Sequence, residues 1–253
     1  RCSTAWTRVL PTGRGQVNTK GLDFYDRLVD AMCAANIEPF LTLYHWDLPQ
    51  ALQDEGGWEN RNTCHAFADY SALAVKHFGD RVKYWTTFNE PSVVAFDGNL
   101  SGEHAPGNQD PRITYQVAHN LMVAHGLGVQ AIRSANSKVE AGIVLNLWMA
   151  DPATDSPEDI AEAKAAWDRS ETLFLDPIFK GHYPLAAYDL VGENMPKIYD
   201  GDLALISQEL DYVGINFYSR NLVSASGHID KVHGSEYTEM GWEVCAPAMR
   251  RML

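Results

Sequence analysis

Short runs of apolar residues alternate along the chain with longer stretches in which apolar residues recur every three or four positions. The short runs predict β-strands at Arg1–Val9, Pro39–Trp46, Tyr84–Glu90, Val139–Leu147 and Tyr212–Ser219. Nearly continuous apolar strands that alternate with helices are typical of parallel pairing with the helices outside. The pattern therefore predicts an α/β fold organised as one domain.

Three amphipathic helices are predicted between these strands. The first presents an apolar face between Leu22 and Met32, and the second extends from about Asn62 to Phe78. The third extends from about Pro111 to Ser134, with Asp110 as its N-cap and proline in its first position. At the C-terminus, Ala248–Leu253 resembles the first turns of another helix.

The length of the chain leaves two architectures open. A compact (β/α)8 TIM barrel uses roughly 31 residues for each strand-helix unit. Here 253 residues supply only five predicted strands. The sequence is therefore either an open five-stranded sheet or part of a larger barrel.

Polar and aromatic side chains gather where successive predicted strands end. The groups at these ends are Tyr44–Asp47 on the second strand, Asn89 and Glu90 on the third, Asn146 on the fourth, and Asn216 and Tyr218 on the fifth. Because α/β barrels carry their active sites at the carboxyl ends of the strands, these residues are the candidates for a functional site.

Glu90 is the candidate with the clearest chemistry. It ends a predicted strand, and Pro91 behind it is expected to hold it extended. Trp85 and Phe88 make the region poorly solvated, and a carboxyl group in such surroundings can act as a general acid. The alternative is a structural Glu that pairs with an arginine or caps a helix. The six-residue segment Thr86–Pro91 alone does not decide between the two roles.

His45, Trp46 and Asp47 lie together in one strand-to-loop turn. They offer hydrogen bonds and a flat apolar face, which suit a sugar ring. A metal site at His45 and Asp47 lacks a third ligand at a credible position. His119 and His125 are six residues apart on one predicted helix, so they are interpreted as buried helix contacts.

Glycine pairs offer no phosphate site. Gly56-Gly57 and Gly126-x-Gly128 do not follow predicted strands with the spacing of nucleotide-binding loops.

The composition excludes several classes of partner. With 20 Lys and Arg against 33 Asp and Glu, the net charge of −13 repels nucleic acid and anionic lipid but not a neutral substrate. The longest nearly apolar run, Ala141–Ala150, is too short to span a bilayer, and the N-terminus has no apolar signal-peptide core. Four widely spaced cysteines predict reduced, part-buried thiols and a cytoplasmic location.

Several long motifs together resemble family 1 glycoside hydrolases, the β-glucosidases and their relatives. The matching blocks, in the family's order, are Arg1–Arg8, Gly21–Asp26, Leu43–Gln50 (L-Y-H-W-D-L-P-Q), Thr87–Pro91 (T-F-N-E-P), His104–Gly107, Gly214–Ser219 and Met240–Val244. This resemblance implies a TIM barrel, of which residues 1–253 supply about strands two to six as one catalytic-domain fragment.

The resemblance also implies roles for individual residues. Glu90 is then the general acid that protonates the leaving oxygen and afterwards the base that activates water. Asn89 holds the 2-hydroxyl of the sugar, His45 binds hydroxyls of the same sugar, and Trp46 shapes that subsite. The sugar's leaving group, the aglycone, lies against Asn146 and Trp148.

Three further residues are implied to support the nucleophile. Arg1 and Tyr218 steer and stabilise this carboxylate, and Asn216 supports the same region. The sequence departs from the family at Ser92, where Trp is usual, which is expected to loosen the aglycone subsite. It departs again at Cys2, where Phe is common, and there a packing change is expected.

The nucleophile itself is not assigned. The family places it in a T-E-N-G motif, which does not occur in this sequence, and Glu236, Glu239 and Glu243 do not end a predicted strand. The chain is therefore expected to lack the barrel's first strand and its last two strands, and to be inactive alone.

The leading hypothesis is a retaining β-glycosidase that removes terminal β-D-glucosyl residues from cello-oligosaccharides and aryl or alkyl β-glucosides. The alternatives are a 6-phospho-β-glycosidase of the same family and a non-catalytic sugar-binding fragment. Acid/base chemistry on a neutral sugar implies no cofactor and no metal. The expected partner is a small β-glycoside, with neither nucleic acid nor membrane.

Overall fold

Five parallel strands form the central sheet of the molecule. The computed structural model describes residues 1–229 and 231–253. Across the sheet the strands are β1 (Cys2–Ser3), β2 (Phe40–Tyr44), β3 (Tyr84–Asn89), β4 (Glu140–Asn146) and β6 (Tyr212–Asn216). The predicted α/β class and the parallel pairing are confirmed.

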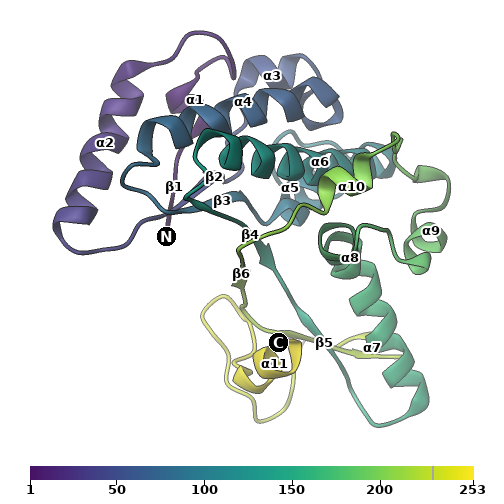
Figure 1. Ribbon diagram of the computed structural model, residues 1–253. Helices are drawn as coiled ribbons and strands as arrows, with labels where there is room; N and C mark the ends of the chain where they lie inside the picture. Colours follow the sequence, from purple (N-terminus) through teal and green to yellow (C-terminus); the bar gives the residue numbers. More distant parts are fainter. Residues whose placement is uncertain (230) are drawn as a thin grey trace.

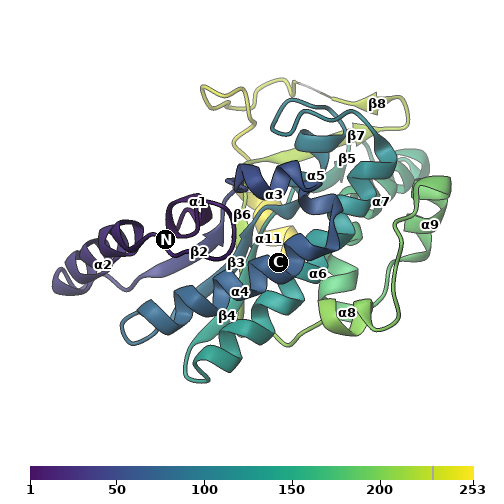
Figure 2. The same ribbon diagram turned by 90° about the horizontal axis from the view of Figure 1, so that it is seen from above.

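The three long helices lie along one face of this sheet (Figures 1 and 2). They are α2 (Thr19–Ala34), α4 (Arg61–Phe78) and α6 (Pro111–Ala135), close to the predicted ranges. Asp110 is the predicted N-cap of α6, because its Oδ1 accepts hydrogen bonds from the backbone N–H groups of Arg112 (2.8 Å) and Ile113 (3.3 Å).

An aromatic cluster joins the helices to the sheet. Trp6 stacks on Tyr70 with ring centroids 5.3 Å apart, and Phe67 lies 4.5 Å from Phe88 on β3. All four side chains are fully buried, so each contributes about 1.5–3 kcal/mol of hydrophobic stabilisation. Because Phe88 is two residues before Glu90, this packing also fixes the end of β3.

The first predicted strand is wrong over most of its length. The predicted span Arg1–Val9 contains only β1, and α1 (Trp6–Val9) follows it. Trp6 and Val9 are three residues apart and both fully buried, which is helical spacing and brings both side chains into the core. Their apolar character alone did not distinguish helix from strand.

A second sheet, which the sequence did not predict, extends β4 and β6. After a short break each strand resumes, as β5 (Met149–Pro152) and β7 (Arg220–Ser224), and β8 (Gly227–His228) pairs with β7. The helices α7 (Pro157–Ser170) and α11 (Ala246–Met252) lie beside β5, beyond the ends of β4 and β6 (Figure 1). The predicted C-terminal helix is confirmed by α11.

Shorter helices fill the connections. They are α3 (Gln50–Asp54), η1 (Gly57–Glu59), α5 (Pro91–Asn99), α8 (Thr172–Lys180), α9 (Leu185–Val191), η2 (Gly192–Asn194) and α10 (Asp202–Ile206). Gly126 lets α6 approach α10, since a Cβ there would lie 1.9 Å from the carbonyl oxygen of Leu205. The glycines of α6 therefore serve helix packing.

Two other predictions concern the thiols and the membrane. All four cysteines are free, with Cys64 buried and Cys2 and Cys245 half-buried, but Cys33 is exposed and not part-buried as expected. Cys33 lies in the last turn of α2, one residue before the helix ends at Ala34. Within residues 1–229 and 231–253, no helix combines the length and the hydropathy needed to cross a bilayer.

Candidate active site

The carboxyl ends of the parallel strands meet at one edge of the sheet, and all the predicted site residues lie there. The residues at this edge are His45 and Trp46 after β2, Asn89 and Glu90 at the end of β3, Asn146 at the end of β4, Asn216 at the end of β6 and Tyr218 just after it. Arg1 lies at the amino end of β1, and its guanidinium group reaches this edge to bond to Asn89 and Asn216. The residues singled out at the predicted strand ends are therefore brought together at one edge of the sheet.

Glu90 makes the whole turn from β3 into α5. Its backbone is left-handed, with φ of 48° and ψ of 67°, so the extended conformation predicted from Pro91 is wrong. Pro91 already occupies the first position of α5, which leaves one residue to reverse the chain direction. A non-glycine residue in this region costs about 1–3 kcal/mol and persists only where the surroundings hold it. The backbone N–H of Glu90 donates to the carbonyl of Val144 at 2.8 Å and helps to hold it.

The Glu90 carboxyl group is buried and faces two donors. Only 4% of the residue is exposed. The Nδ2 of Asn216 and the hydroxyl of Tyr218 (3.2 Å) both donate to its Oε1. No residue in the described part of the chain bonds to Oε2, which leaves this oxygen available to a molecule in the adjoining cleft.

Asn89 connects Glu90 to the other strand ends. Its Oδ1 accepts hydrogen bonds from Arg1 Nη2 (2.8 Å) and Asn216 Nδ2 (3.0 Å). Its Nδ2 lies 3.3 Å from His45 Nε2, and Ser3 Oγ lies 3.1 Å from His45 Nδ1. Since Asn89 Nδ2 can only donate, His45 Nε2 accepts and Nδ1–H donates to Ser3. The network therefore selects one tautomer of a neutral ring.

The charge state of His45 agrees with this network. Burial first, and then the Arg1 cation, lower the pKa of His45 below its ordinary value of 6.5, while Glu90 opposes them. The ring is therefore neutral at pH 7 and can both donate and accept. Trp46 fixes the same turn with φ of 79°, and its Nε1 donates to the Asn89 carbonyl at 3.0 Å.

Three aromatic side chains, Trp148, Tyr218 and Trp242, pack together where β4 gives way to β5 and β6 to β7, and we call them the aromatic wall. Trp148 lies between β4 and β5, and Tyr218 lies between β6 and β7, with their ring centroids 6.1 Å apart. Trp242 packs 4.8 Å from Tyr218 and 6.0 Å from Trp148. Because Trp148 and Tyr218 lie outside the strands, their side chains need not alternate between the two faces of the sheet, and both line the cleft.

The cleft beside this wall has a volume of about 720 Å³ and includes Trp46, Glu90, Asn146, Trp148 and Tyr218 in its lining. Its size is in the range of small-molecule sites. Aromatic faces together with a few hydrogen-bonding groups are the surface that a sugar ring requires, because the ring has apolar C–H faces and polar hydroxyl edges.

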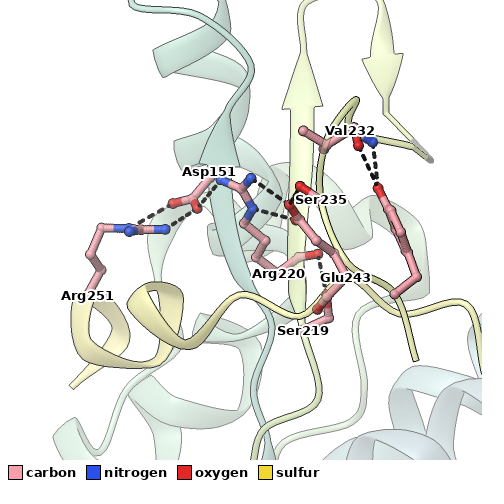
Figure 3. Close-up of polar contacts among 8 residues, drawn as sticks. Asp151, Ser219, Arg220, Val232, Ser235, Glu243 and Arg251 are labelled. Atoms are coloured by element: carbon pink, nitrogen blue, oxygen red, sulfur yellow. Dashed lines mark hydrogen bonds and ion pairs between the residues drawn. The ribbon is translucent and has the colours of Figure 1, made fainter.

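Figure 3 shows a network of ion pairs formed by Asp151, Arg220, Glu243 and Arg251. Arg220 follows Tyr218 by two residues and Glu243 follows Trp242 directly, so the network adjoins the aromatic wall along the chain. Arg220 binds Glu243 through Nε (2.7 Å) and Nη2 (3.0 Å), and Asp151 through Nη1 (3.1 Å). Arg251 also pairs with Asp151, and Ser235 donates to Glu243 at 2.6 Å. Both oxygens of Glu243 are thus occupied, so this late carboxylate is a structural group.

Ser92 and Asn146 form a polar pair in the cleft lining. Ser92 Oγ donates to Asn146 Oδ1 at 2.6 Å. The amide orientation that this bond selects leaves the Asn146 Nδ2 group as a donor, without a partner among residues 1–229 and 231–253. The position that departs from the family's usual Trp therefore carries a small hydrogen-bonded side chain here.

Glu171 is a cleft residue that the sequence analysis missed. It lies between α7 and α8, is 6% exposed, and accepts a hydrogen bond from the Trp148 backbone N–H at 3.3 Å. Burial raises the pKa of Glu171 to about 7, against the Trp148 and Ser170 hydrogen bonds, which lower it. No motif surrounds Glu171, and only the folding of α7 against the wall brings it to the cleft.

The pKa of Glu171 predicts a stability effect. Its ordinary value is 4.5 and its folded value about 7, so the folded state holds the proton more tightly and becomes less stable as pH rises through this window. We expect the unfolding free energy of the wild type to fall by roughly 2–3 kcal/mol relative to Glu171→Gln between about pH 5 and pH 8. Urea unfolding of both proteins at the two pH values measures this, and parallel pH profiles would contradict it.

The two histidines of α6, His119 and His125, have structural roles. His119 is buried between the Tyr183 hydroxyl (2.8 Å) and Asp202 (2.9 Å), and His125 is buried against the Thr87 hydroxyl (2.7 Å), as expected of helix contacts. In the described part of the chain, His, Cys, Asp and Glu side chains form no group of three that could hold a metal ion.

Comparison with known proteins gives a consistent result. The family model for glycosyl hydrolase family 1 matches residues 1–252. A 1,4-beta-D-glucan glucohydrolase from Thermotoga neapolitana is 43% identical over 250 residues, which cover 96% of this chain and 59% of the relative. A 6-phospho-beta-galactosidase from Clostridium acetobutylicum is 39% identical over 256 residues, covering 97% of this chain and 54% of the relative.

Solved structures show the same likeness in three dimensions. A family 1 β-glucosidase from Thermotoga maritima, in complex with isofagomine lactam, superposes with a TM-score of 0.93 at 40% identity, covering 99% of this chain and 57% of that one. The TIM-barrel prediction is confirmed, and the five-stranded sheet is the corresponding part of such a barrel. The chain spans less than two thirds of the length of these relatives.

Proposed function

Because this chain belongs to glycosyl hydrolase family 1, we propose that the protein carrying it is a retaining β-glucosidase that acts on cello-oligosaccharides and on aryl or alkyl β-glucosides. Residues 1–253 form part of its single catalytic domain. The observation that supports this most strongly is the buried Glu90 carboxyl group, which is bonded on one oxygen and open to the cleft on the other.

In the first step, a second carboxylate attacks the anomeric carbon to form a glycosyl-enzyme, while Glu90 protonates the glycosidic oxygen and the aglycone leaves as an alcohol. In the second step, Glu90 takes a proton from the water that releases the sugar. Tyr218 and Asn216, which now donate to Glu90, have hydrogen bonds to offer to the nucleophilic carboxylate. Arg1 supplies positive charge to the same region through its contacts with Asn89 and Asn216.

We assign sugar binding to Asn89 and to the residues that follow β2, His45 and Trp46. In the neutral tautomer that Ser3 and Asn89 select, His45 Nε2 can accept from a sugar hydroxyl in place of Asn89, and Trp46 offers its indole face. Asn89 is placed to hold the 2-hydroxyl, a bond that strengthens as charge develops at the neighbouring anomeric carbon. Asn146 and Trp148 remain for the aglycone.

We assign no nucleophile within residues 1–253. Retention requires a second carboxyl group about 5 Å from the acid, and Glu243 is occupied by Arg220. The 253-residue chain alone is therefore expected to show no turnover above a mock preparation.

The 6-phospho-β-glycosidase alternative is kept because of the Clostridium relative. It is disfavoured by the cleft itself, where Arg169 is the one Lys or Arg among the described lining residues and is paired with Glu162. The four free thiols suit a reducing compartment, and we place the protein in the cytoplasm.

Initial rates of the complete protein on cellobiose, 4-nitrophenyl β-glucoside and 4-nitrophenyl 6-phospho-β-glucoside test the proposal. Hydrolysis of the first two, with at least tenfold lower kcat/KM for the phosphorylated substrate, is expected; that ratio corresponds to about 1.4 kcal/mol. The opposite preference would support the phosphoglycosidase, and no turnover of any substrate would support a non-catalytic sugar-binding protein.

A further inference from the structure

Glu171 is a second carboxyl group in the cleft of Glu90, and the proposed mechanism gives it no task. Its side chain is buried, and its Oε1 is held by the Trp148 backbone N–H at 3.3 Å. The neighbouring Arg169 guanidinium is directed to Glu162 instead. Glu171 therefore has no cationic partner among the described residues, which is costly for a buried carboxylate.

The other charged and titratable groups around the cleft come from three elements. Glu90 and Asp97 lie at the two ends of the cleft-facing part of α5, Arg169 lies on α7, and Tyr218 follows β6. None of them is hydrogen-bonded to Glu171 in the described part of the chain. Glu171 is therefore free to bond to a molecule that enters the cleft.

Glu171 lies on the leaving-group side of the acid. The lining of this cleft includes Glu171 and Asn146 with Glu90, but not His45 or Asn89, which are assigned to the sugar, while Trp46 borders both regions. The Ser92–Asn146 pair adds a second hydrogen-bonding group to the same region. This half of the cleft is therefore polar opposite the Trp148–Tyr218 wall.

On the basis of the proposed function, we infer that Glu171 is a specificity-determining residue that selects a hydroxyl-bearing aglycone, such as a second sugar, over an alkyl chain. A sugar hydroxyl can donate to the carboxylate and replace the water lost on binding. An alkyl chain offers no donor, so it buries the carboxylate unpaired, with a penalty that grows as the group ionises.

The test compares cellobiose with hexyl β-glucoside in the complete protein. Both aglycones leave as alcohols and require protonation by Glu90, so the ratio of their kcat/KM values cancels most of that requirement. In the wild type, this ratio is expected to rise about tenfold from pH 5.5 to about pH 8.5, because kcat/KM reports groups titrating in the free enzyme.

In Glu171→Gln the ratio is expected to change less than about twofold over the same range, since Gln keeps the shape but not the charge. Asp97→Asn is the matched control, because it removes another carboxyl group from the cleft lining and should retain the wild-type rise. A rise that persists in Glu171→Gln, or that disappears in Asp97→Asn, would overturn the inference. Failure of the wild type to hydrolyse either substrate would instead refute the proposed function.

Discussion

Replacing Glu90 with Gln is expected to reduce kcat/KM for cellobiose by about 10²- to 10⁴-fold, the usual contribution of a general acid. Gln keeps the size of the side chain and can still pair with Tyr218 and Asn216, but it cannot transfer a proton. The glucose that departs from cellobiose is a poor leaving group, so cleavage of its bond depends fully on that proton.

Activated substrates distinguish a lost acid from a disordered site. Dinitrophenyl β-glucoside needs little protonation, so its first step should be nearly unchanged in Glu90→Gln, and the glycosyl-enzyme should accumulate because water lacks its base. The burst of dinitrophenol and the steady-state rates measure both effects. Asp97→Asn serves as the control and should lower neither rate more than about twofold. An equal loss on both substrates would contradict a general-acid role for Glu90.

Replacing Arg220 with Met is expected to destabilise the protein by about 3 kcal/mol. The Arg220 side chain is 19% exposed, and its partners Asp151 and Glu243 are 9% and 10% exposed. Met fills the space of the stem but leaves Glu243 with Ser235 alone and Asp151 with Arg251 alone. Two largely buried carboxylates then lack most of their compensation.

The same substitution should weaken substrate binding, because Glu243 adjoins Trp242 and Arg220 follows Tyr218 by two residues in the sequence. We expect KM for aryl glucosides to rise more than kcat falls, as the aromatic wall loses its anchor. Urea unfolding and steady-state kinetics measure the two effects. Arg250→Met, at an exposed position on α11, is the matched control. Equal stability of the two variants would refute the role of this network.

The sequence predicted the sheet and the edge that carries the candidate site because both depend on local patterns. Apolar runs located β2, β3, β4 and β6, and the polar residues that ended them came together because parallel strands end at one edge. The role proposed for Glu90 rests on its position at a strand end, but its left-handed backbone did not follow from the sequence. That conformation depends on where α5 begins, which six residues do not determine.

Features created by tertiary packing could not be predicted in the same way. The strands β5 and β7 are short and form only because they continue β4 and β6 side by side. Glu171 directly follows the polar helix α7 and becomes a buried carboxyl group only when the junction of α7 and α8 packs against Trp148. Its surroundings, and hence its raised pKa, are a property of the fold rather than of neighbouring residues.

Proton NMR of the anomeric protons during hydrolysis by the complete protein tests the central claim most directly. The proposed mechanism, in which Glu90 acts first as acid and then as base on one face of the sugar, predicts that β-glucose appears first and that α-glucose grows only by later mutarotation. The appearance of α-glucose as the first product would contradict it.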